Sequence, residues 1–351
     1  MKQYIPLVVV LILIAGAIFV LESSKTNAST SVIKIPAINL TSVLEKEGKY
    51  SKAVEVVNPS GFVNTPNLTV SSLIGKKIIL VDFWTYSCIN CQRTLPYLNA
   101  WYDKYRDQGL EIVSIHTPEF EFEKNISNVK TAVEKFGIKY PVILDNEYGT
   151  WTAYSNRYWP HKYLIDIDGY IVYDHIGEGS YEETEKEIQK LLLERQEKLR
   201  LNTSVNMSIV QPRVKFNEPT TQVSQETYLG AARNSQIGNG NPGEVGVKEF
   251  TLPQSGEVGK YYLSGAWNVQ GEYIECISNC SLTYAYYAKN VFLVASSANA
   301  SELGVKTRTN STSLNVMDST LYTLVNVDNY EANVLELTMQ KGFRAYAFTF
   351  G

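Results

Sequence analysis

Two cysteines, Cys88 and Cys91, stand two residues apart where a strand pattern gives way to a helix pattern. Residues 78–83 are apolar except for Asp82, as in a buried strand, and apolar residues recur at helical spacing over residues 95–105. A sulfur at a helix start lies beside unpaired backbone N–H groups and the positive end of the helix dipole, which favour the thiolate. Thiolate is the nucleophile of disulfide exchange. We therefore expect Cys88 to be the exposed nucleophile and Cys91, one turn inside, to be the buried resolving thiol.

The residues before the cysteines favour redox chemistry, although the spacing alone also fits half a zinc site or a small structural disulfide. A carboxylate in a buried strand is costly unless it has a task, because desolvation disfavours its charged form. We expect Asp82 to have a raised pKa and to take a proton from Cys91; the alternative is a polar residue at a fraying strand end. Trp84, four residues before Cys88, is expected to cover the site.

This segment resembles thioredoxin. The acid two residues before Trp84, the Trp-x-x-x-Cys-x-x-Cys spacing and Pro96, five residues after Cys91, all match. The resemblance implies a thioredoxin fold without a cofactor. The dipeptide between the cysteines, Ile89-Asn90, replaces the Gly-Pro of thioredoxin, so the strongly reducing potential of thioredoxin is not carried over. Reductant, oxidant and isomerase all remain open.

The chain downstream alternates strand and helix patterns, as an α/β domain requires. Strands are predicted at residues 110–116, 140–144, 162–167 and 170–175, and helices at residues 123–136 and 181–199. Thioredoxin-like proteins carry a cis-proline, facing the cysteines, at the start of the strand after the second helix. The resemblance assigns this role to Pro160, with an ordinary trans proline as the alternative, and Trp159 would shape the substrate groove.

Longer runs narrow the resemblance to the TlpA and redoxin branch of the thioredoxin superfamily, and within it to DipZ-type proteins. They are WTYSCINC (residues 84–91), HTPEFEFEK (116–124), YPVILDNEY (140–148) and YWPHKYLIDIDG (158–169). Residues 226–230 and 345–351 resemble the start and end of the β-rich domain that follows DipZ thioredoxin modules. The chain lacks the CcdA-like membrane portion of full DipZ proteins, so a separate CcdA-like membrane protein is the expected electron partner.

Three further residues have two interpretations each. Glu119 follows a predicted central strand, and is either a functional acid in the substrate groove or a carboxylate stabilised by a helix start. His116 and His161 could bind a metal or tune the thiolate, but lone histidines are more often structural, and no metal is expected.

The N-terminus predicts the location of the protein. Lys2 precedes an uncharged, apolar segment of 17 residues (residues 5–21), and Glu22 follows it. This length is near the minimum for a helix that spans a membrane. The basic residue before the segment and the acidic residue after it favour an anchor with the rest of the chain outside the cytoplasm. A signal peptide cleaved near Ala28, which would release a secreted protein, is the competing interpretation.

The chain is long enough for two domains. We expect an anchor or signal peptide at residues 1–28, a polar stalk at 29–57 with a short helix near 42–54, and a thioredoxin-like redox domain at 58–200. A linker that packs little would follow at 201–223, and a β domain at 224–351. Eight short β-branched and aromatic runs in the last region predict a jelly-roll-like β-sandwich. They span residues 247–252, 259–267, 272–275, 282–287, 291–296, 321–327, 334–339 and 344–350.

Cys276 and Cys280 bracket a predicted turn between two strands of this β domain. If the chain is exported, these cysteines are expected to be oxidised to a disulfide that closes a hairpin. A four-cysteine zinc site that joins both domains is the alternative, although only one pair has metal-like spacing.

Two function classes remain. The first is an enzyme that exchanges disulfides with protein thiols; the second is a cell-surface module in which the β domain binds glycan or protein and the thioredoxin domain is a scaffold. The presence of Cys88, Cys91, Asp82 and Pro160 together favours the enzyme, because a scaffold needs none of them. A peroxiredoxin is disfavoured, since no proline of the Pro-x-x-x-Thr-x-x-Cys pattern precedes Cys88. Net charge −4 without a long basic run argues against nucleic acid as a partner.

Overall fold

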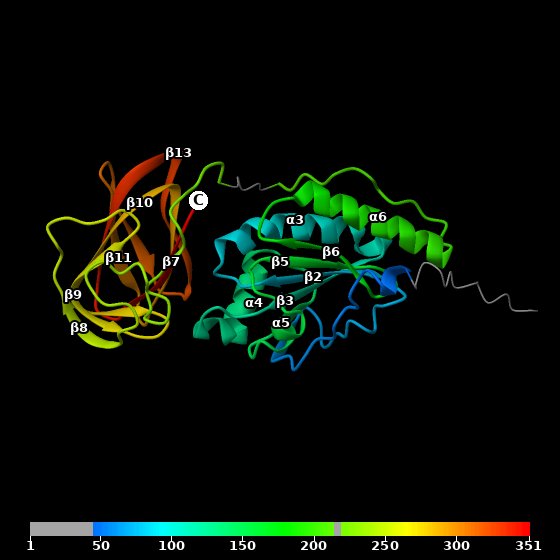
Figure 1. The fold of residues 1–351 in the computed structure, drawn as a ribbon, viewed down its shortest axis with the longest axis horizontal. Helices are drawn as coiled ribbons and strands as arrows, with labels where there is room; N and C mark the ends of the chain where they lie inside the picture. The colour runs from blue at the N-terminus through cyan, green and yellow to red at the C-terminus, as the bar shows by residue number, and fades with distance from the viewer. Residues whose placement is uncertain (1–44, 214–218) are drawn as a thin grey trace, which may run out of the picture. The chain divides into compact units, whose positions relative to one another are not determined.

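The computed structural model of the protein describes residues 45–213 and 219–351. Residues Lys49–Gly351 form one compact unit that contains two β-sheets (Figure 1). The predicted anchor, residues 5–21, lies outside the described residues. Within the described ranges, no helix is both long and apolar enough to cross a membrane.

The first sheet has six strands in the order β1-β4-β3-β2-β5-β6. Strand β2 pairs in parallel with β3 and antiparallel with β5, so it lies at the centre. Its strands are β1 (Gly61–Val63), β2 (Ile78–Trp84), β3 (Leu110–His116), β4 (Val142–Leu144), β5 (His161–Ile165) and β6 (Ile171–Ile176). The connecting helices are α3 (Ile89–Tyr105), η1 (Arg106–Gln108), η2 (Glu121–Lys124), α4 (Ile126–Lys135), α5 (Gly149–Ala153) and α6 (Tyr181–Leu199).

Both faces of this sheet are covered, which explains why β2 and β3 are buried along their whole length. Successive side chains of a strand point to opposite faces. Ile78 and Leu80 accordingly join the core beneath α3 and α6, whereas Ile79 and Val81 join a second core. The second core is covered by apolar residues from the segment 53–74 and by the region around α5. Strand β2 therefore carries the chain through the centre of the domain and ends at the cysteines.

Two segments differ from their expectation as polar connectors. Residues 51–54 are extended rather than helical, and they run beside the first sheet, where the Ala53 amide donates to the Gly169 carbonyl. After α6, Val205 and Val210 pack against the helical core, and the side chain of Lys104 donates to the Ser208 carbonyl. In both segments a few apolar residues at suitable spacing outweigh a polar composition, because each buried side chain contributes about 1.5–3 kcal/mol.

The C-terminal domain is all β, as predicted. Its strands are β7 (Thr227–Tyr228), β8 (Gly246–Phe250), β9 (Tyr261–Val269), β10 (Ile274–Ser297), β11 (Ser301–Lys306), β12 (Ser311–Val316), β13 (Thr320–Met339) and β14 (Phe343–Phe350). Several of the predicted short runs merge into two long strands, β10 and β13. Predicted breaks in β10 and β13 are register shifts near Ala288 and Val291 rather than turns. A bulge inserts a residue without ending the strand, so the polar residues there do not terminate pairing. The strand pairing describes one continuous sheet, and the jelly-roll topology stays a prediction.

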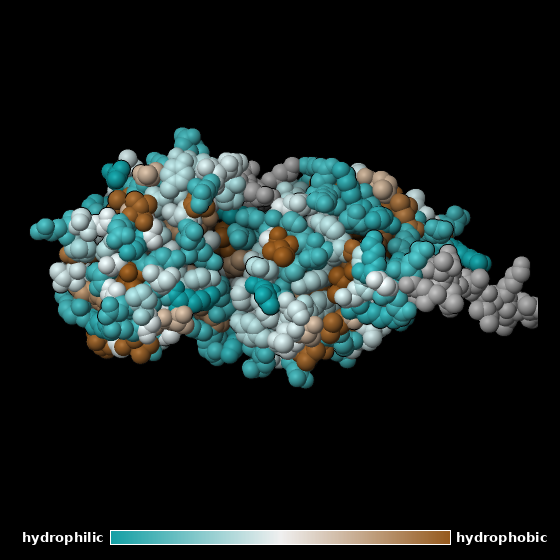
Figure 2. All heavy atoms as spheres, viewed as in Figure 1, coloured by the Kyte–Doolittle hydropathy of each residue, from teal (hydrophilic) through white to brown (hydrophobic). Residues whose placement is uncertain are grey.

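The two domains contact each other through an aromatic cluster. Phe120 and Phe122, from the loop after β3, pack against the ring of Tyr346 on β14 at centroid distances of 5.2 and 4.9 Å. The Tyr86 hydroxyl also donates to the Ser319 carbonyl at 3.1 Å. The face drawn in Figure 2 is mainly hydrophilic, with apolar residues in small separate groups.

Candidate functional site

Cys88 is the N-cap of helix α3, and its position is fixed by the strand that precedes it. Its Sγ accepts a hydrogen bond from the Cys91 amide at 3.4 Å. Cys88 is partly accessible and Cys91 is buried; both are free thiols. Burial raises the pKa of the Cys91 thiol well above its ordinary value, and the hydrogen bond and charge of Cys88 raise it further. The thiol that a substrate can reach is therefore Cys88, whereas Cys91 is buried and protonated.

Asp82 lies within the central strand with only 1% of its surface exposed. Among the described residues, neither carboxyl oxygen of Asp82 has a hydrogen-bond partner. Burial raises the pKa of Asp82 to about 7, against the opposing charge of Lys162, its register partner on β5. The negative charge of Asp82 in turn contributes to the raised pKa of Cys91. A carboxylate that titrates near neutral pH close to a thiol is suited to accept its proton.

The Trp159–Pro160 peptide bond is cis, and Pro160 directly precedes β5, the strand beside β2. Trp159 donates a hydrogen bond from Nε1 to the Thr117 carbonyl at 3.0 Å, and its ring packs on Trp151. Trp159 and Cys88 line the same cavity. Trp84 does not line that cavity: it is fully buried, and its ring meets His116 edge-on. Trp84 belongs to the same buried core as Cys91, so its role as a cover over the cysteines stays a prediction, whereas Trp159 lines the cavity beside Cys88.

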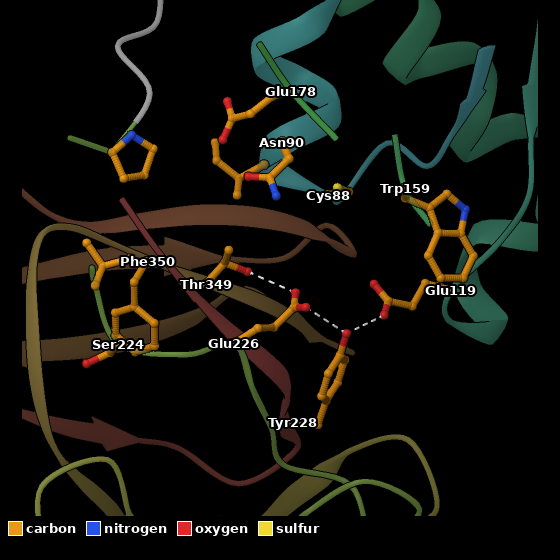
Figure 3. A pocket seen from close by; sticks show the side chains of 13 residues that line it. Cys88, Asn90, Glu119, Trp159, Glu178, Ser224, Glu226, Tyr228, Thr349 and Phe350 are labelled. Carbon is orange, nitrogen blue, oxygen red and sulfur yellow. Dashed lines mark hydrogen bonds between the residues drawn. The ribbon is translucent and has the colours of Figure 1, made fainter. Parts of the chain in front are cut away.

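The cavity at Cys88 has a volume of about 270 Å³ and is lined from both domains (Figure 3). On one side are the Cys88 sulfur, Trp159 and Glu119; on the other are residues of the β domain. Glu119 was expected in the substrate groove, and it does line the cavity. What the sequence analysis missed is the opposite wall, Glu226 and Tyr228, since nothing in a sequence shows that residues so far apart face one cysteine.

A hydrogen-bond network connects the two walls. The Tyr228 hydroxyl lies 2.7 Å from Glu119 Oε1 and 2.9 Å from Glu226 Oε2, between the two carboxylates (Figure 3). Arg233 forms an ion pair with Glu119 at 2.8 Å, and its guanidinium lies 3.6 Å from the centroid of the Tyr228 ring. Desolvation by the surrounding protein, followed by the negative charge of Glu119, raises the pKa of Glu226 to about 7, although Glu226 remains partly open to solvent.

Glu123 is a second residue that the sequence analysis missed. It is fully buried and accepts hydrogen bonds from the Ser87 hydroxyl at 2.6 Å and from the Glu119 amide at 2.6 Å. Burial raises the pKa of Glu123 to about 7, although its hydrogen bonds favour the ionised form. Ser87 directly precedes Cys88, so Glu123 connects the loop that carries Cys88 to the loop that carries Glu119. In the sequence it appeared only as an acid at a helix start.

Both histidines of the sequence analysis have protein partners. His116 is fully buried, lies 3.5 Å from the Thr85 hydroxyl and stacks on Tyr86. Burial lowers the pKa of His116 to about 3, so it is neutral. His161 is held between Asn156 and Asp174 at 2.6 and 2.9 Å. These contacts give each histidine a structural role.

Cys276 and Cys280 form the predicted disulfide, but the predicted turn between two strands is wrong: both cysteines lie within the continuous strand β10, where the pairing with β9 shifts register, so the disulfide does not close a hairpin. Both belong to the core of the β domain, whereas Cys91 belongs to the helical core of the thioredoxin domain. The second cysteine pair therefore closes a local loop, in a different core from the first.

Comparisons with known proteins agree with this architecture. Residues 224–351 match the family described as a thioredoxin-like C-terminal domain, and residues 52–174 match the AhpC/TSA family. Over 297 residues the chain is 34% identical to Protein DipZ of Mycobacterium bovis, and the match covers 83% of this chain. The chain spans only 42% of the length of DipZ.

Two shorter relatives are matched over most of their length. The thiol-disulfide oxidoreductase ResA of Bacillus cereus is 36% identical over 135 residues, which are 36% of this chain and 75% of ResA. The thiol-disulfide oxidoreductase YkuV of Bacillus subtilis is 31% identical over 127 residues, which are 36% of this chain and 85% of YkuV. With these relatives matched over three quarters or more of their own length, the chain belongs to the thioredoxin-like TlpA/redoxin family of thiol-disulfide oxidoreductases.

Proposed function

We propose that the protein exchanges disulfides with protein thiols through a Cys88–Cys91 cycle. The observation that carries this proposal is the combination of three groups at one site. They are the accessible Cys88 sulfur at a helix N-terminus, the buried Cys91 thiol one turn further along, and the buried Asp82 carboxyl with a pKa of about 7. Each group has the environment that one step of the exchange requires.

In the reducing direction, the Cys88 thiolate attacks one sulfur of a substrate disulfide. The substrate S–S bond breaks, one substrate thiolate leaves, and a mixed disulfide to Cys88 forms. Asp82 then accepts the proton of Cys91, whose thiolate attacks the Cys88 sulfur and releases the second substrate thiolate. Two electrons pass from the protein dithiol to the substrate. The oxidising direction is the reverse of these steps.

The test is turnover of a protein disulfide with dithiothreitol as electron donor. We expect the full chain to accelerate the reaction and Cys88→Ser to abolish the acceleration. A matched control is Ser278→Ala, at an exposed position of strand β10 between Cys276 and Cys280, which should behave as the wild type. Equal rates for the wild type and Cys88→Ser would overturn the proposal.

We further propose that the protein is anchored in a membrane with its redox domain outside the cytoplasm, and that a separate CcdA-like membrane protein is its electron partner. The support is the apolar segment at residues 5–21 with Lys2 before it and Glu22 after it, together with the similarity to part of DipZ. A membrane-impermeant thiol reagent should label Cys88 in intact cells, and the protein should stay with membranes after a salt wash. Labelling only after permeabilisation would contradict the proposed topology, and a mature chain that begins near Ser29 would show a cleaved signal instead.

A further inference from the structure

The cavity at Cys88 is lined by negatively charged side chains from both domains, Glu119 and Glu178 from the thioredoxin domain and Glu226 from the β domain. Its described lining residues include three carboxylates, Glu119, Glu178 and Glu226, and among those residues there is no lysine or arginine. Two of the carboxylates have an arginine just behind them: Glu178 pairs with Arg93 at 3.0 Å, and Glu119 pairs with Arg233 at 2.8 Å.

Glu226 differs from the other two. Among the described residues, no lysine or arginine forms an ion pair with it, and its polar partners are the hydroxyls of Tyr228 at 2.9 Å and Thr349 at 3.4 Å. Tyr228 has a single hydroxyl proton for two carboxylates, and Glu119 is the nearer of them. Glu119 and Glu226 together carry two negative charges when ionised, and Arg233, which pairs with Glu119, compensates only one of them. One negative charge is therefore left uncompensated. The raised pKa of Glu226 agrees with that excess charge.

The place of this charge matters because the same cavity contains the nucleophile. Any disulfide that reaches Cys88 must put one sulfur, and the few atoms attached to it, into a space of about 270 Å³. Such a space takes a small molecule or one extended chain rather than a folded surface. A positive group on those atoms would meet Glu226 while the sulfur meets Cys88 (Figure 3).

We propose that the preferred substrate disulfide carries a cationic group, an ammonium or a guanidinium, a few bonds from its sulfur, and that Glu226 of the β domain selects it. This inference rests on the proposed exchange cycle, and it assigns the β domain a part in substrate choice. The chemistry is that of the cycle itself: Cys88 attacks, the S–S bond of the cationic disulfide breaks, and two electrons from the dithiol reduce it.

The test compares three small disulfides on the reduced full chain. Cystamine is dicationic, bis(2-hydroxyethyl) disulfide is neutral and 3,3′-dithiodipropionate is dianionic. The readout is the rate of Cys88–Cys91 oxidation in a single turnover, followed by acid quench, alkylation and mass spectrometry. The assay runs at about pH 8, where Glu226 is ionised and an ordinary amine is still protonated.

The decisive quantity is the ratio of the cystamine rate to the neutral rate, compared between wild type and Glu226→Gln, because intrinsic reactivity cancels in that comparison. We expect this ratio to fall roughly three- to tenfold in Glu226→Gln, as for the loss of one charge near a binding site, and the relative rate of the dianion to rise. The control Glu302→Gln, an exposed acid on β11, should keep the wild-type ratio. An unchanged ratio in Glu226→Gln would overturn the inference.

A measurement without any substitution guards against misfolding of the variant. Raising the salt from about 20 mM to about 500 mM should lower the cystamine ratio of the wild type, because the screening length then shrinks to a few ångströms. A wild-type ratio that does not change with salt would also overturn the inference. If none of the three disulfides oxidises the Cys88–Cys91 pair, the exchange cycle itself fails, so the two failures are distinguishable.

Discussion

The hydroxyl of Tyr228, on strand β7 of the β domain, donates a hydrogen bond of 2.7 Å to Oε1 of Glu119, in the loop after strand β3 of the thioredoxin domain. The two residues are 109 positions apart in the sequence. Both line the cavity that contains Cys88. The β domain therefore supplies one wall of the redox site.

Removal of this hydroxyl should loosen the contact. We expect Tyr228→Phe to lower the free energy of unfolding by about 1–2 kcal/mol, because the carboxylate of Glu119 loses the hydrogen bond that the Tyr228 hydroxyl donates to it. The measurement is denaturant unfolding followed by fluorescence. Tyr287→Phe, at a partly exposed tyrosine of β10, is the matched control and should change stability little. Equal stabilities for both variants would show that the Tyr228–Glu119 bond contributes nothing measurable.

Replacement of the resolving thiol should trap the substrate. In Cys91→Ser, the mixed disulfide at Cys88 has no intramolecular thiol to release it, so covalent complexes should accumulate and resolve on adding dithiothreitol. Non-reducing gels and mass spectrometry check this outcome. Cys88→Ser should trap nothing. Complexes through Cys91 in that variant would reverse the assignment of the two roles.

Asp82 should make stability depend on pH with a definite sign. Its pKa is about 7 in the fold, against about 3.9 in an unfolded chain, so the folded state binds more protons between these values. The stability that depends on Asp82 is therefore fully present below about pH 4, where the carboxyl group is protonated in both states. It is progressively lost as the pH rises to about 7, because the unfolded chain ionises first.

Asp82→Asn removes this titration. Relative to the wild type, the variant should gain at most about 4 kcal/mol of unfolding free energy between about pH 4 and about pH 8. Its release of the Cys88 mixed disulfide should be slower, because the proton acceptor for Cys91 is gone. Denaturant unfolding over this pH range checks the first outcome and stopped-flow kinetics the second. Stability curves that stay parallel would contradict the raised pKa.

Glu123 should affect the site by holding Ser87 and Glu119 in position. Glu123→Ala leaves the Ser87 hydroxyl and the Glu119 amide without their acceptor, and we expect it to lower the free energy of unfolding by about 2–4 kcal/mol. It should also slow alkylation of Cys88, since Ser87 fixes the start of α3. Glu121→Ala, an exposed acid two residues earlier, is the control. If both variants lose equal stability, the buried network is not the cause.

The Cys276–Cys280 disulfide should be structural. The double variant Cys276→Ser with Cys280→Ser should lower the stability of the β domain by about 1–2 kcal/mol, because the closed loop is short. Turnover should remain close to that of the wild type. A trapped crosslink between Cys91 and Cys276 or Cys280 would instead make the second pair part of an electron relay.

The proposed thiol–disulfide chemistry could be predicted from the sequence alone. Cys88, Cys91 and Asp82 are close in the chain, and their roles follow from a local rule, a strand that ends at a helix start, so no distant contact was needed to propose them. The same holds for β3 and α6, whose predicted bounds match the structure because their patterns are long and regular. The class of the second domain also followed from its short β-branched runs.

The residues that face Cys88 could be identified only from the folded structure. Trp84 lies in the buried core together with Cys91 and does not line the cavity, because the orientation of a side chain at a strand end depends on the packing beneath the sheet. Glu226 and Tyr228 reach the cavity across a domain contact formed by aromatic packing, for which the sequence has no periodic pattern. A reactive thiol can be read from neighbours in the chain, but the pocket that selects its substrate depends on residues that only folding brings together.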